Sequence, residues 1–260
     1  MSDFLETVMA ERRADAQASR RGSPATRGSG KDRPSFVDAL RAARAAGRVA
    51  VIAEVKRRSP ALGDLATDAD AVAIAAAYAH AGAAAISILT EPRHWGGSID
   101  DLAAVSAAVT VPVLYKDIVV DEQQLLEAEA AGASAVLLIA EALDDVTLAS
   151  FVARAEALGM TALVEAHEHH AFARAVASGA TVVGVNARNL RVPSELDTER
   201  IEALHQLARP GQLLVAESGI ATPADVEALP GRVDAVLVGT ALMRAPDPGA
   251  LVRALAAVRR

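Results

Sequence analysis

Short apolar runs alternate with longer, mixed apolar and polar segments along most of this chain. The runs are rich in Val, Ile, Leu and Ala, which is typical of buried strands when the run is this short. Eight such runs cover Ala50–Val55, Ala84–Leu89, Pro112–Lys116, Ala135–Ile139, Thr161–Glu165, Thr181–Asn186, Leu213–Glu217 and Ala235–Gly239.

The segments between the runs have helical spacing, as in Asp121–Ala131 and Val146–Leu158. Four of the runs are preceded by a glycine where a helix would end, at Gly82, Gly132, Gly159 and Gly179. Eight strand–helix units predict a parallel α/β fold, and a closed (βα)8 TIM barrel is the favoured form. An open, doubly wound sheet is the alternative. It is disfavoured because no Gly-x-Gly-x-x-Gly follows the first run.

The first 48 residues do not follow this alternation. The pattern predicts a helix from Asp3 to about Ala18, then a mobile basic loop over Ser19–Lys31, and a second helix over Ser35–Ala46 that stops at Gly47. A nucleic-acid-binding arm is the alternative for the loop, but no aromatic residues are interleaved with its basic ones. We therefore expect N-terminal helices and a flexible basic loop over residues 1–48, and one barrel domain over residues 49–260.

Composition narrows the class of protein. The chain has 260 residues, of which 52% are hydrophobic, and a net charge of −7, which disfavours a general nucleic-acid-binding surface. The absence of cysteine excludes disulfides, thiolate catalysis and cysteine-based zinc sites. The alanine-rich stretch Ala71–Leu89 is better explained by helix, turn and strand than by a membrane span. The N-terminus lacks a secretory signal, so we expect a cytoplasmic protein.

Charged side chains follow the first apolar run directly. Glu54 and Lys56 are two residues apart and so point to the same face of the strand, where burying charge is costly unless it is paired or used. Most of the other runs also end in polar residues, namely Lys116, Glu165, Asn186, Arg188, Glu217, Ser218 and Thr240. Each alone could simply begin a solvated loop. As a set at the carboxyl ends of barrel strands, they predict an acid–base active site.

Two glycine-containing turns predict an anion site at the same end. Ser218-Gly219 follows the seventh run and Gly239-Thr240 follows the eighth, with Thr240 placed to begin a helix at Ala241. Backbone N–H groups in such turns bind phosphate in many barrels, although a plain turn explains either one alone.

Two further features have competing interpretations. His167, His169 and His170 could suggest a metal, but their spacing does not converge on one ligand set, so exposed residues of a first helical turn are favoured. Trp95 lies in a loop with two glycines after the second run. It could be a core residue or a wall over a flat ligand.

The strand-end motifs together resemble the indole-3-glycerol-phosphate synthase family of (βα)8 enzymes. The motifs occur in the family's order and are Ile52-Ala53-Glu54-Val55-Lys56-Arg57-Arg58-Ser59-Pro60, Ser87-Ile88-Leu89-Thr90-Glu91, Lys116-Asp117, Leu163-Val164-Glu165, Gly184-Val185-Asn186-Ala187-Arg188-Asn189-Leu190, Ala216-Glu217-Ser218-Gly219-Ile220 and Val238-Gly239-Thr240-Ala241-Leu242-Met243. The resemblance implies conversion of 1-(2-carboxyphenylamino)-1-deoxyribulose 5-phosphate to indole-3-glycerol phosphate, with loss of CO2 and water. It implies no metal, no organic cofactor, no nucleic acid, no membrane and no obligatory protein partner.

The resemblance also implies roles for residues. Lys116 resembles the general acid of ring closure, Glu165 a carboxylate for later proton transfers, and Lys56 a lysine that contacts substrate anions and takes part in dehydration. The other catalytic candidates are Glu54, Glu217 and Asn186. The implied substrate-binding residues are Ser59, Arg188, Trp95, Leu190 and Ser218, and the phosphate-binding residues are Lys56, Gly219, Gly239 and Thr240. The residues do not decide whether Lys56 or Glu165 is the main acid in dehydration.

The chain departs from the family's pattern in three places. Ile118 and Trp95 both stand where the family usually has phenylalanine, which puts substrate affinity in doubt. The N-terminal arm is short and rich in Gly and Ser, so we expect looser closure over the substrate. Two other functions are disfavoured. A phosphate-binding barrel isomerase fits poorly with the resemblance at Lys56, Asn186 and Arg188, and a non-enzymatic phosphometabolite-binding protein with the intact Lys56, Lys116 and Glu165. Turnover would separate them.

Overall fold

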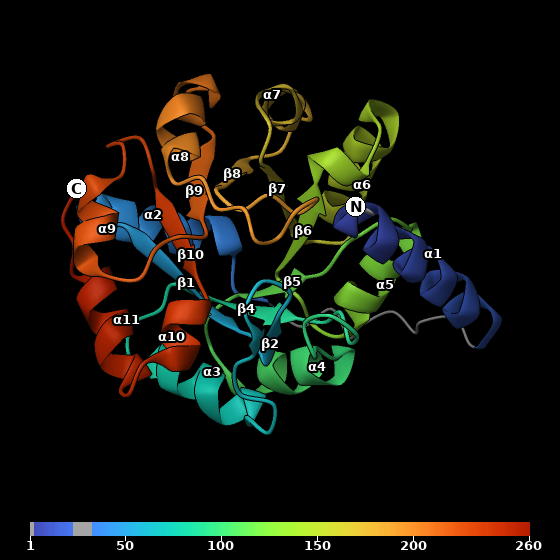
Figure 1. The fold of residues 1–260 in the computed structure, drawn as a ribbon, viewed down its shortest axis with the longest axis horizontal. Coiled ribbons are helices and arrows are strands. Elements are labelled where there is room, and N and C mark those ends of the chain that lie inside the picture. The colour runs from blue at the N-terminus through green and yellow to red at the C-terminus, as the bar shows by residue number, and fades with distance from the viewer. Residues whose placement is uncertain (1–2, 23–32) are drawn as a thin grey trace.

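Eight parallel strands form a closed barrel (Figure 1). The structure is a computed structural model that describes residues 3–22 and 33–260. Around the barrel the strands follow the order β1-β10-β9-β8-β7-β6-β5-β4, and every neighbouring pair is parallel. Their bounds are β1 Ala50–Val55, β4 Ala85–Leu89, β5 Val113–Lys116, β6 Ala135–Ile139, β7 Thr161–Ala166, β8 Val182–Asn186, β9 Leu213–Glu217 and β10 Ala235–Val238. The predicted TIM barrel is confirmed, and the open sheet is excluded because β1 pairs with both β4 and β10.

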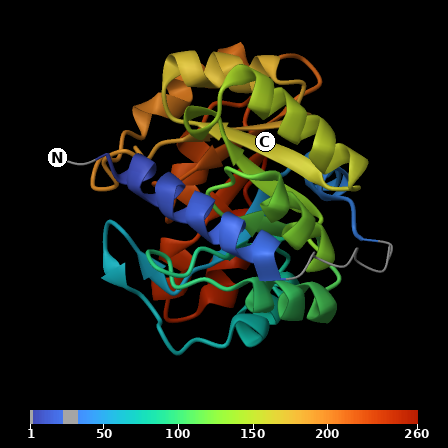
Figure 2. The same ribbon diagram turned by 90° about the vertical axis from the view of Figure 1, so that its right-hand side faces the viewer.

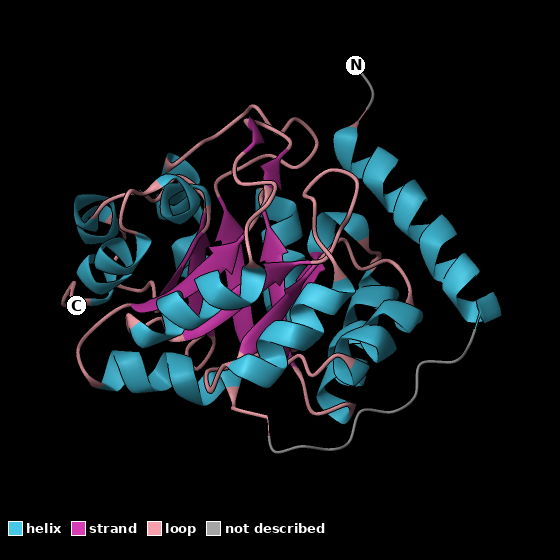
Figure 3. Cartoon of the chain, turned by 90° about the horizontal axis from the view of Figure 1, so that it is seen from below, coloured by secondary structure: helices cyan, strands magenta, loops and turns pink. Residues whose placement is uncertain are grey.

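Helices surround the barrel strands (Figure 3). They are α3 Ala71–His80, α4 Ile99–Ala108, α5 Glu122–Ala130, α6 Asp145–Ala157, α7 His169–Ala177, α8 Glu199–Leu204, α9 Pro223–Ala228, α10 Thr240–Arg244 and α11 Pro248–Ala256, with short 3-10 turns η1 Ala140–Ala142 and η2 His205–Leu207. The four glycines predicted at helix ends all have positive φ, between 73° and 97°. Glycine adopts this conformation without the steric cost that other residues have, which explains how each helix turns back into the next strand.

The stretch Ala71–Leu89 is helix α3, a turn at Gly82 and strand β4, as predicted. None of the helices formed by residues 3–22 and 33–260 combines the length and the apolar character that crossing a bilayer needs.

Two helices precede the barrel. Helix α2, Phe36–Ala45, matches its prediction, with Ser35 as N-cap. Helix α1 runs from Phe4 to Gly22 and crosses the outside of the barrel beside α5 (Figure 2). It is longer than predicted, so the prediction of a loop beginning at Ser19 is wrong for residues 19–22. The rest of that predicted loop, residues 23–31, lies outside the described residues.

The extension of α1 has a tertiary cause. The Ser19 hydroxyl donates to Glu127 Oε1 of α5 at 2.5 Å, and Arg20 pairs with Asp121 at the start of α5. Such contacts with a neighbouring helix stabilise a helical end whose own sequence favours a loop. Local composition does not reveal them.

A second small sheet was not predicted. Strands β2, Arg58–Ser59, and β3, Gly63–Asp64, form a short hairpin in the segment between β1 and α3. Arg58 Nε pairs with Asp64 Oδ1 across it at 2.7 Å. Strands of two residues are too short to show an alternation of polar and apolar positions.

Candidate active site

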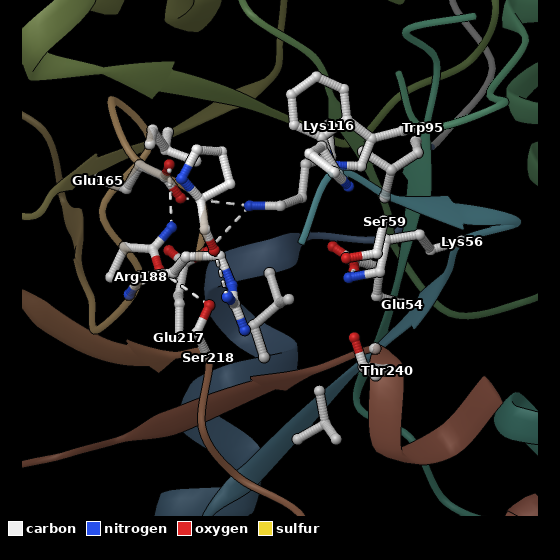
Figure 4. Close-up of a pocket in the computed structure, with 18 of the residues that line it drawn as sticks. Glu54, Lys56, Ser59, Trp95, Lys116, Glu165, Arg188, Glu217, Ser218 and Thr240 are labelled. Atoms are coloured by element: carbon white, nitrogen blue, oxygen red, sulfur yellow. Dashed lines mark hydrogen bonds and ion pairs between the residues drawn. The ribbon is translucent and has the colours of Figure 1, made fainter. Parts of the chain in front are cut away.

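A cavity of about 320 Å³ opens at the carboxyl ends of the barrel strands. Its lining includes every site residue proposed from the sequence: Glu54, Lys56, Ser59, Trp95, Lys116, Glu165, Asn186, Arg188, Leu190, Glu217, Ser218, Gly219, Gly239 and Thr240. These residues come from strands and loops spread over most of the chain, and barrel closure brings them to one mouth (Figure 4).

Lys116 lies between two carboxylates. Its Nζ is 3.2 Å from Glu165 Oε2 and 3.0 Å from Glu217 Oε2 (Figure 4). Burial alone would lower the pKa of Lys116, but the charges of Glu165, Glu217 and Glu54 outweigh it and raise that pKa above its ordinary value. Lys116 is therefore an ammonium ion, with a proton to give.

Glu217 is held toward its neutral form. Burial raises the pKa of Glu217 well above 4.5, and the nearby charge of Glu165 raises it further, whereas Lys116 opposes the change. Its Oε1 is buried without a hydrogen-bond partner, although Oε2 contacts Lys116. A carboxyl group with one unsatisfied oxygen in a site already containing Glu165 is stabilised by carrying a proton.

Asn186 links the carboxylate pair to the rim of the cavity. Its Nδ2 lies 3.4 Å from Glu165 Oε1, and its Oδ1 accepts from the Ser218 hydroxyl and from the Arg188 backbone N–H, both at 2.9 Å. Ser218 has φ of 69°, in the left-handed region that non-glycine residues seldom occupy. Its bond to Asn186 shows what holds this strained turn after β9.

Glu54 and Lys56 form an ion pair of 2.8 Å at the end of β1. Glu54 is 2% exposed and lies against Gly239, the residue that follows strand β10. A Cβ atom on Gly239 would be 2.2 Å from Glu54 Oε1, so only glycine leaves room for this carboxylate. The two lysines therefore have different settings: Lys116 contacts Glu165 and Glu217, whereas Lys56 is paired with Glu54.

The predicted phosphate end lies at the last two barrel strands. Helix α10 begins at Thr240, one residue earlier than expected, directly after Gly239. Thr240 lines the same cavity as Glu54 and Lys56 (Figure 4). A Cβ on Gly219 would be 2.7 Å from Thr198 Cγ2, and its φ is 78°, so this turn also requires glycine. Arg244, which sequence reasoning did not select, lines the same cavity.

Glu91 was also missed, although it belongs to a quoted motif. Its buried carboxylate accepts the backbone N–H groups of Arg93, His94 and Trp95 at 2.9, 2.6 and 3.1 Å. It thereby holds the loop that carries Trp95. The Trp95 ring lines the cavity and also packs near Phe4 of α1, 5.8 Å between ring centroids, so it is both wall and packing residue.

Asp117 anchors helix α1 next to Lys116. Both of its oxygens accept from Arg12 at 2.8 Å, and Thr90 Oγ1 donates to it at 2.6 Å. Burial raises the pKa of Asp117, and the Arg12 charge opposes this. The sequence signal was the motif Lys116-Asp117, but the partner at Arg12 is visible only in three dimensions.

The histidines divide into two kinds. His169 and His170 are exposed in the first turn of α7, as predicted. For His167 the prediction of an exposed residue is wrong: it is half-buried, and its Nδ1 lies 2.8 Å from the backbone oxygen of Asn186. It precedes α7 and turns back toward β8.

One group among residues 3–22 and 33–260 has metal-ligand geometry, formed by Glu11, Glu91 and His94 within 4.8 Å of one another. Its atoms already have partners. Glu91 accepts the three backbone N–H groups, and His94 Nε2 lies 2.8 Å from Glu11 Oε2. These contacts connect α1, through Glu11, to the loop that carries Trp95.

Comparisons with known proteins find relatives along most of the chain. The family model described as indole-3-glycerol phosphate synthase matches residues 5–255. A protein of that name from Parafrankia sp. is 50% identical over 83% of this chain and 80% of its own length. One from Nocardioides sp. is 50% identical over 83% and 82%, and one from Mycobacterium leprae is 46% identical over 84% and 80%.

Among solved structures, a 3-hexulose-6-phosphate synthase matches with a TM-score of 0.66 and 22% identity, over 82% of this chain and 100% of that one. A tryptophan synthase from M. tuberculosis matches with a TM-score of 0.67 and 16% identity, over 88% and 100%. At these identities the likeness shows the barrel fold.

Proposed function

The chain belongs to the indole-3-glycerol phosphate synthase family, and we propose that it catalyses that family's reaction with the side chains described above. The substrate would be 1-(2-carboxyphenylamino)-1-deoxyribulose 5-phosphate, and the products indole-3-glycerol phosphate, CO2 and water. The observation that carries the proposal is the Lys116 ammonium held between Glu165 and Glu217 inside the 320 Å³ cavity.

Ring closure needs an acid beside the ketose carbonyl. As the ring carbon attacks that carbonyl, negative charge develops on its oxygen, and an ammonium in a partly desolvated site stabilises the charge and transfers a proton. Lys116 is charged and its side chain is only 14% exposed, which suits this role. The C–C bond to the carboxylate then breaks, CO2 leaves, and its electron pair restores the aromatic ring.

Dehydration needs a second proton transfer. The new hydroxyl leaves as water after protonation, and a proton is then lost from the neighbouring carbon to complete the indole. Glu165 is placed for these transfers because it contacts Lys116 and is oriented by Asn186. Lys56 and Glu54 form the alternative acid–base pair, at the end of β1, which lies across the barrel from β7 and Glu165.

The cavity offers cations for both anionic ends of the substrate. We assign the anthranilate carboxylate to the side of Arg188, whose Nη1 is held by Pro193 O at 2.6 Å, with Ser59, Trp95 and Leu190 as further walls. The phosphate is assigned to Gly219, Gly239 and Thr240, with Lys56 nearby. We propose that the protein works in the cytoplasm on this small molecule, without nucleic acid, membrane or an obligatory protein partner.

The test is turnover of the purified protein, followed by indole fluorescence. Lys116→Met should lower kcat by about 10²- to 10⁴-fold, the usual contribution of a general acid, and change KM little. Arg41→Met, on the exposed side of α2, is the control and should match wild type. Wild-type protein that binds the substrate without converting it would refute the proposal, and an unchanged kcat in Lys116→Met would remove Lys116 from the acid role.

A further inference from the structure

The proposed reaction consumes protons inside a site that its substrate fills. Two protons are added to the carbonyl oxygen before it leaves as water, one is lost from carbon, and the carboxylate leaves as neutral CO2. One proton per turnover must therefore come from solvent. The route of this proton to Glu165 rests on the proposed function, in which the substrate occupies the main cavity that Glu165 lines.

A second, much smaller cavity lies behind Glu165. Its volume is about 10 Å³, at the lower limit for one water molecule. Glu165 and Asn186 line both this cavity and the main one, so together they form part of the wall between the two. The small cavity is also lined by Glu141 and His167, two titratable residues with no part in the mechanism above.

The contacts of His167 define its free nitrogen. A backbone carbonyl can only accept, so the 2.8 Å contact with Asn186 O makes Nδ1 the donor and leaves Nε2 to gain or lose a proton. His167 is half-buried, so part of this residue is open to solvent. The backbone N–H groups of His167 and Glu168 both donate to Glu141 Oε1, at 2.7 and 2.9 Å, which fixes the start of α7 against η1.

The charged groups around His167 are mostly acidic. Glu141 and Glu165 share the cavity with it, and Glu168 is adjacent in the chain. Arg191 lies on the same cavity, but it is engaged by Glu168 at 3.8 Å and by Asp3 of α1.

We propose that His167 relays the proton consumed in each turnover from solvent to Glu165, through one water molecule in the small cavity. The imidazolium Nε2–H gives its proton to the water as the water gives one of its own to the Glu165 carboxylate. His167 is left neutral and takes a new proton from solvent. The Asn186 carbonyl keeps the imidazole in place through both states.

His167→Asn is the informative variant because its Nδ2 can still donate to the Asn186 carbonyl but cannot carry a proton. We expect kcat to fall about 10²-fold, the lower end of acid–base effects, with KM and Tm unchanged. Because the imidazole that carries the proton is lost, the kcat–pH profile of His167→Asn should differ from that of wild type. In His167→Ala, added imidazole should restore kcat in proportion to its concentration. His170→Asn, exposed one turn away, is the matched control and should behave as wild type.

The outcomes separate the relay from the reaction itself. If wild type forms indole and His167→Asn does so at the same kcat and with the same pH profile, the relay is wrong and the proposed function stands. If kcat falls but neither the pH profile nor added imidazole responds, His167 has only a structural role and the relay is again wrong. If wild type forms no indole from bound substrate, both proposals fail.

Discussion

Gly184→Ala would add a single methyl group beside the catalytic carboxylates. Gly184 lies in β8, and a Cβ built on it is 2.4 Å from Glu217 Oε1 and 3.4 Å from both Glu165 Cβ and Leu163 Cδ1. The backbone there is not in the left-handed region, so the substitution brings no conformational strain of its own. Its effect must therefore pass through Glu217.

The size of the effect follows from the geometry. Ordinary contact begins near 3.4 Å, so Glu217 Oε1 must move by about 1 Å. Oε1 has no hydrogen-bond partner and can move, but the same carboxyl holds Lys116 through Oε2 at 3.0 Å. Misplacing a catalytic group by about 1 Å costs about 10²-fold, which is about 2.7 kcal/mol in the barrier. The cost in stability should be near the lower end for overpacking, about 1 kcal/mol, because a free side-chain end takes up the strain.

Steady-state indole formation and thermal unfolding would be measured on the same preparations. Gly231→Ala is the control because nothing lies within 4 Å of its Cβ position and its φ is not positive. In a Glu217→Ala background, Gly184→Ala should have almost no further effect on kcat, since the atom it displaces is gone. A Gly184→Ala protein with wild-type kcat would refute the claim that the position of Glu217 controls Lys116, and equal losses in both backgrounds would place the effect elsewhere.

Three other predictions test the anchoring of α1, the state of Glu217 and the wall of the cavity. Arg12→Ala leaves the buried Asp117 carboxylate without its ion pair and should lower the free energy of unfolding, measured by urea titration, by about 3–5 kcal/mol. Arg20→Ala removes a more exposed ion pair and should lower it by less than about 1 kcal/mol. Because burial raises the pKa of Glu217, the contribution of its protonated form to stability is full below pH 4.5 and is lost as the pH rises through the folded-state pKa. Glu217→Gln should therefore flatten the fall of Tm with pH over that range. An unchanged slope would contradict this. Trp95 is the only tryptophan and lines the cavity, so in the 15N-labelled protein unlabelled indole-3-glycerol phosphate should shift its indole N–H resonance, while inorganic phosphate should not. An unmoved resonance at saturating product would place Trp95 away from the ligand.

The barrel strands could be predicted because nearly all of their positions are buried and most of those are apolar. β1, β6 and β9 have the predicted bounds, and β10 ends one residue before Gly239. The candidate site followed from the same pattern, since parallel strands bring their carboxyl ends to one edge and the polar residues stand there. The end of α1 and the β2–β3 hairpin were missed because tertiary contacts, or strands of two residues, leave no periodic signal.

The missed site residues share another cause. Glu91 and Asp117 act through their partners: Glu91 binds three backbone N–H groups, and Asp117 binds Arg12, which is 105 residues away. A carboxylate at a strand end looks the same in sequence whether it faces substrate or ties down a loop. The burial of the carboxylate and the direction in which its side chain points decide between these two roles, and both depend on the closed barrel.

The balance of charge in the cavity explains why Glu217 should carry a proton. Two of the carboxylates that line the cavity already have partners: Glu91 binds backbone N–H groups and Asp117 binds Arg12. The other charged lining residues are three carboxylates, Glu54, Glu165 and Glu217, and four cations, Lys56, Lys116, Arg188 and Arg244. The substrate brings a carboxylate and a phosphate, so a more positive cavity attracts it more strongly. With Glu217 protonated, the four cations exceed the two remaining carboxylates by two positive charges instead of one. The unpartnered Oε1 of Glu217 and the crowding of Glu165 and Glu217 around Lys116 then serve binding as well as chemistry, because they keep one negative charge out of an anion-binding cavity.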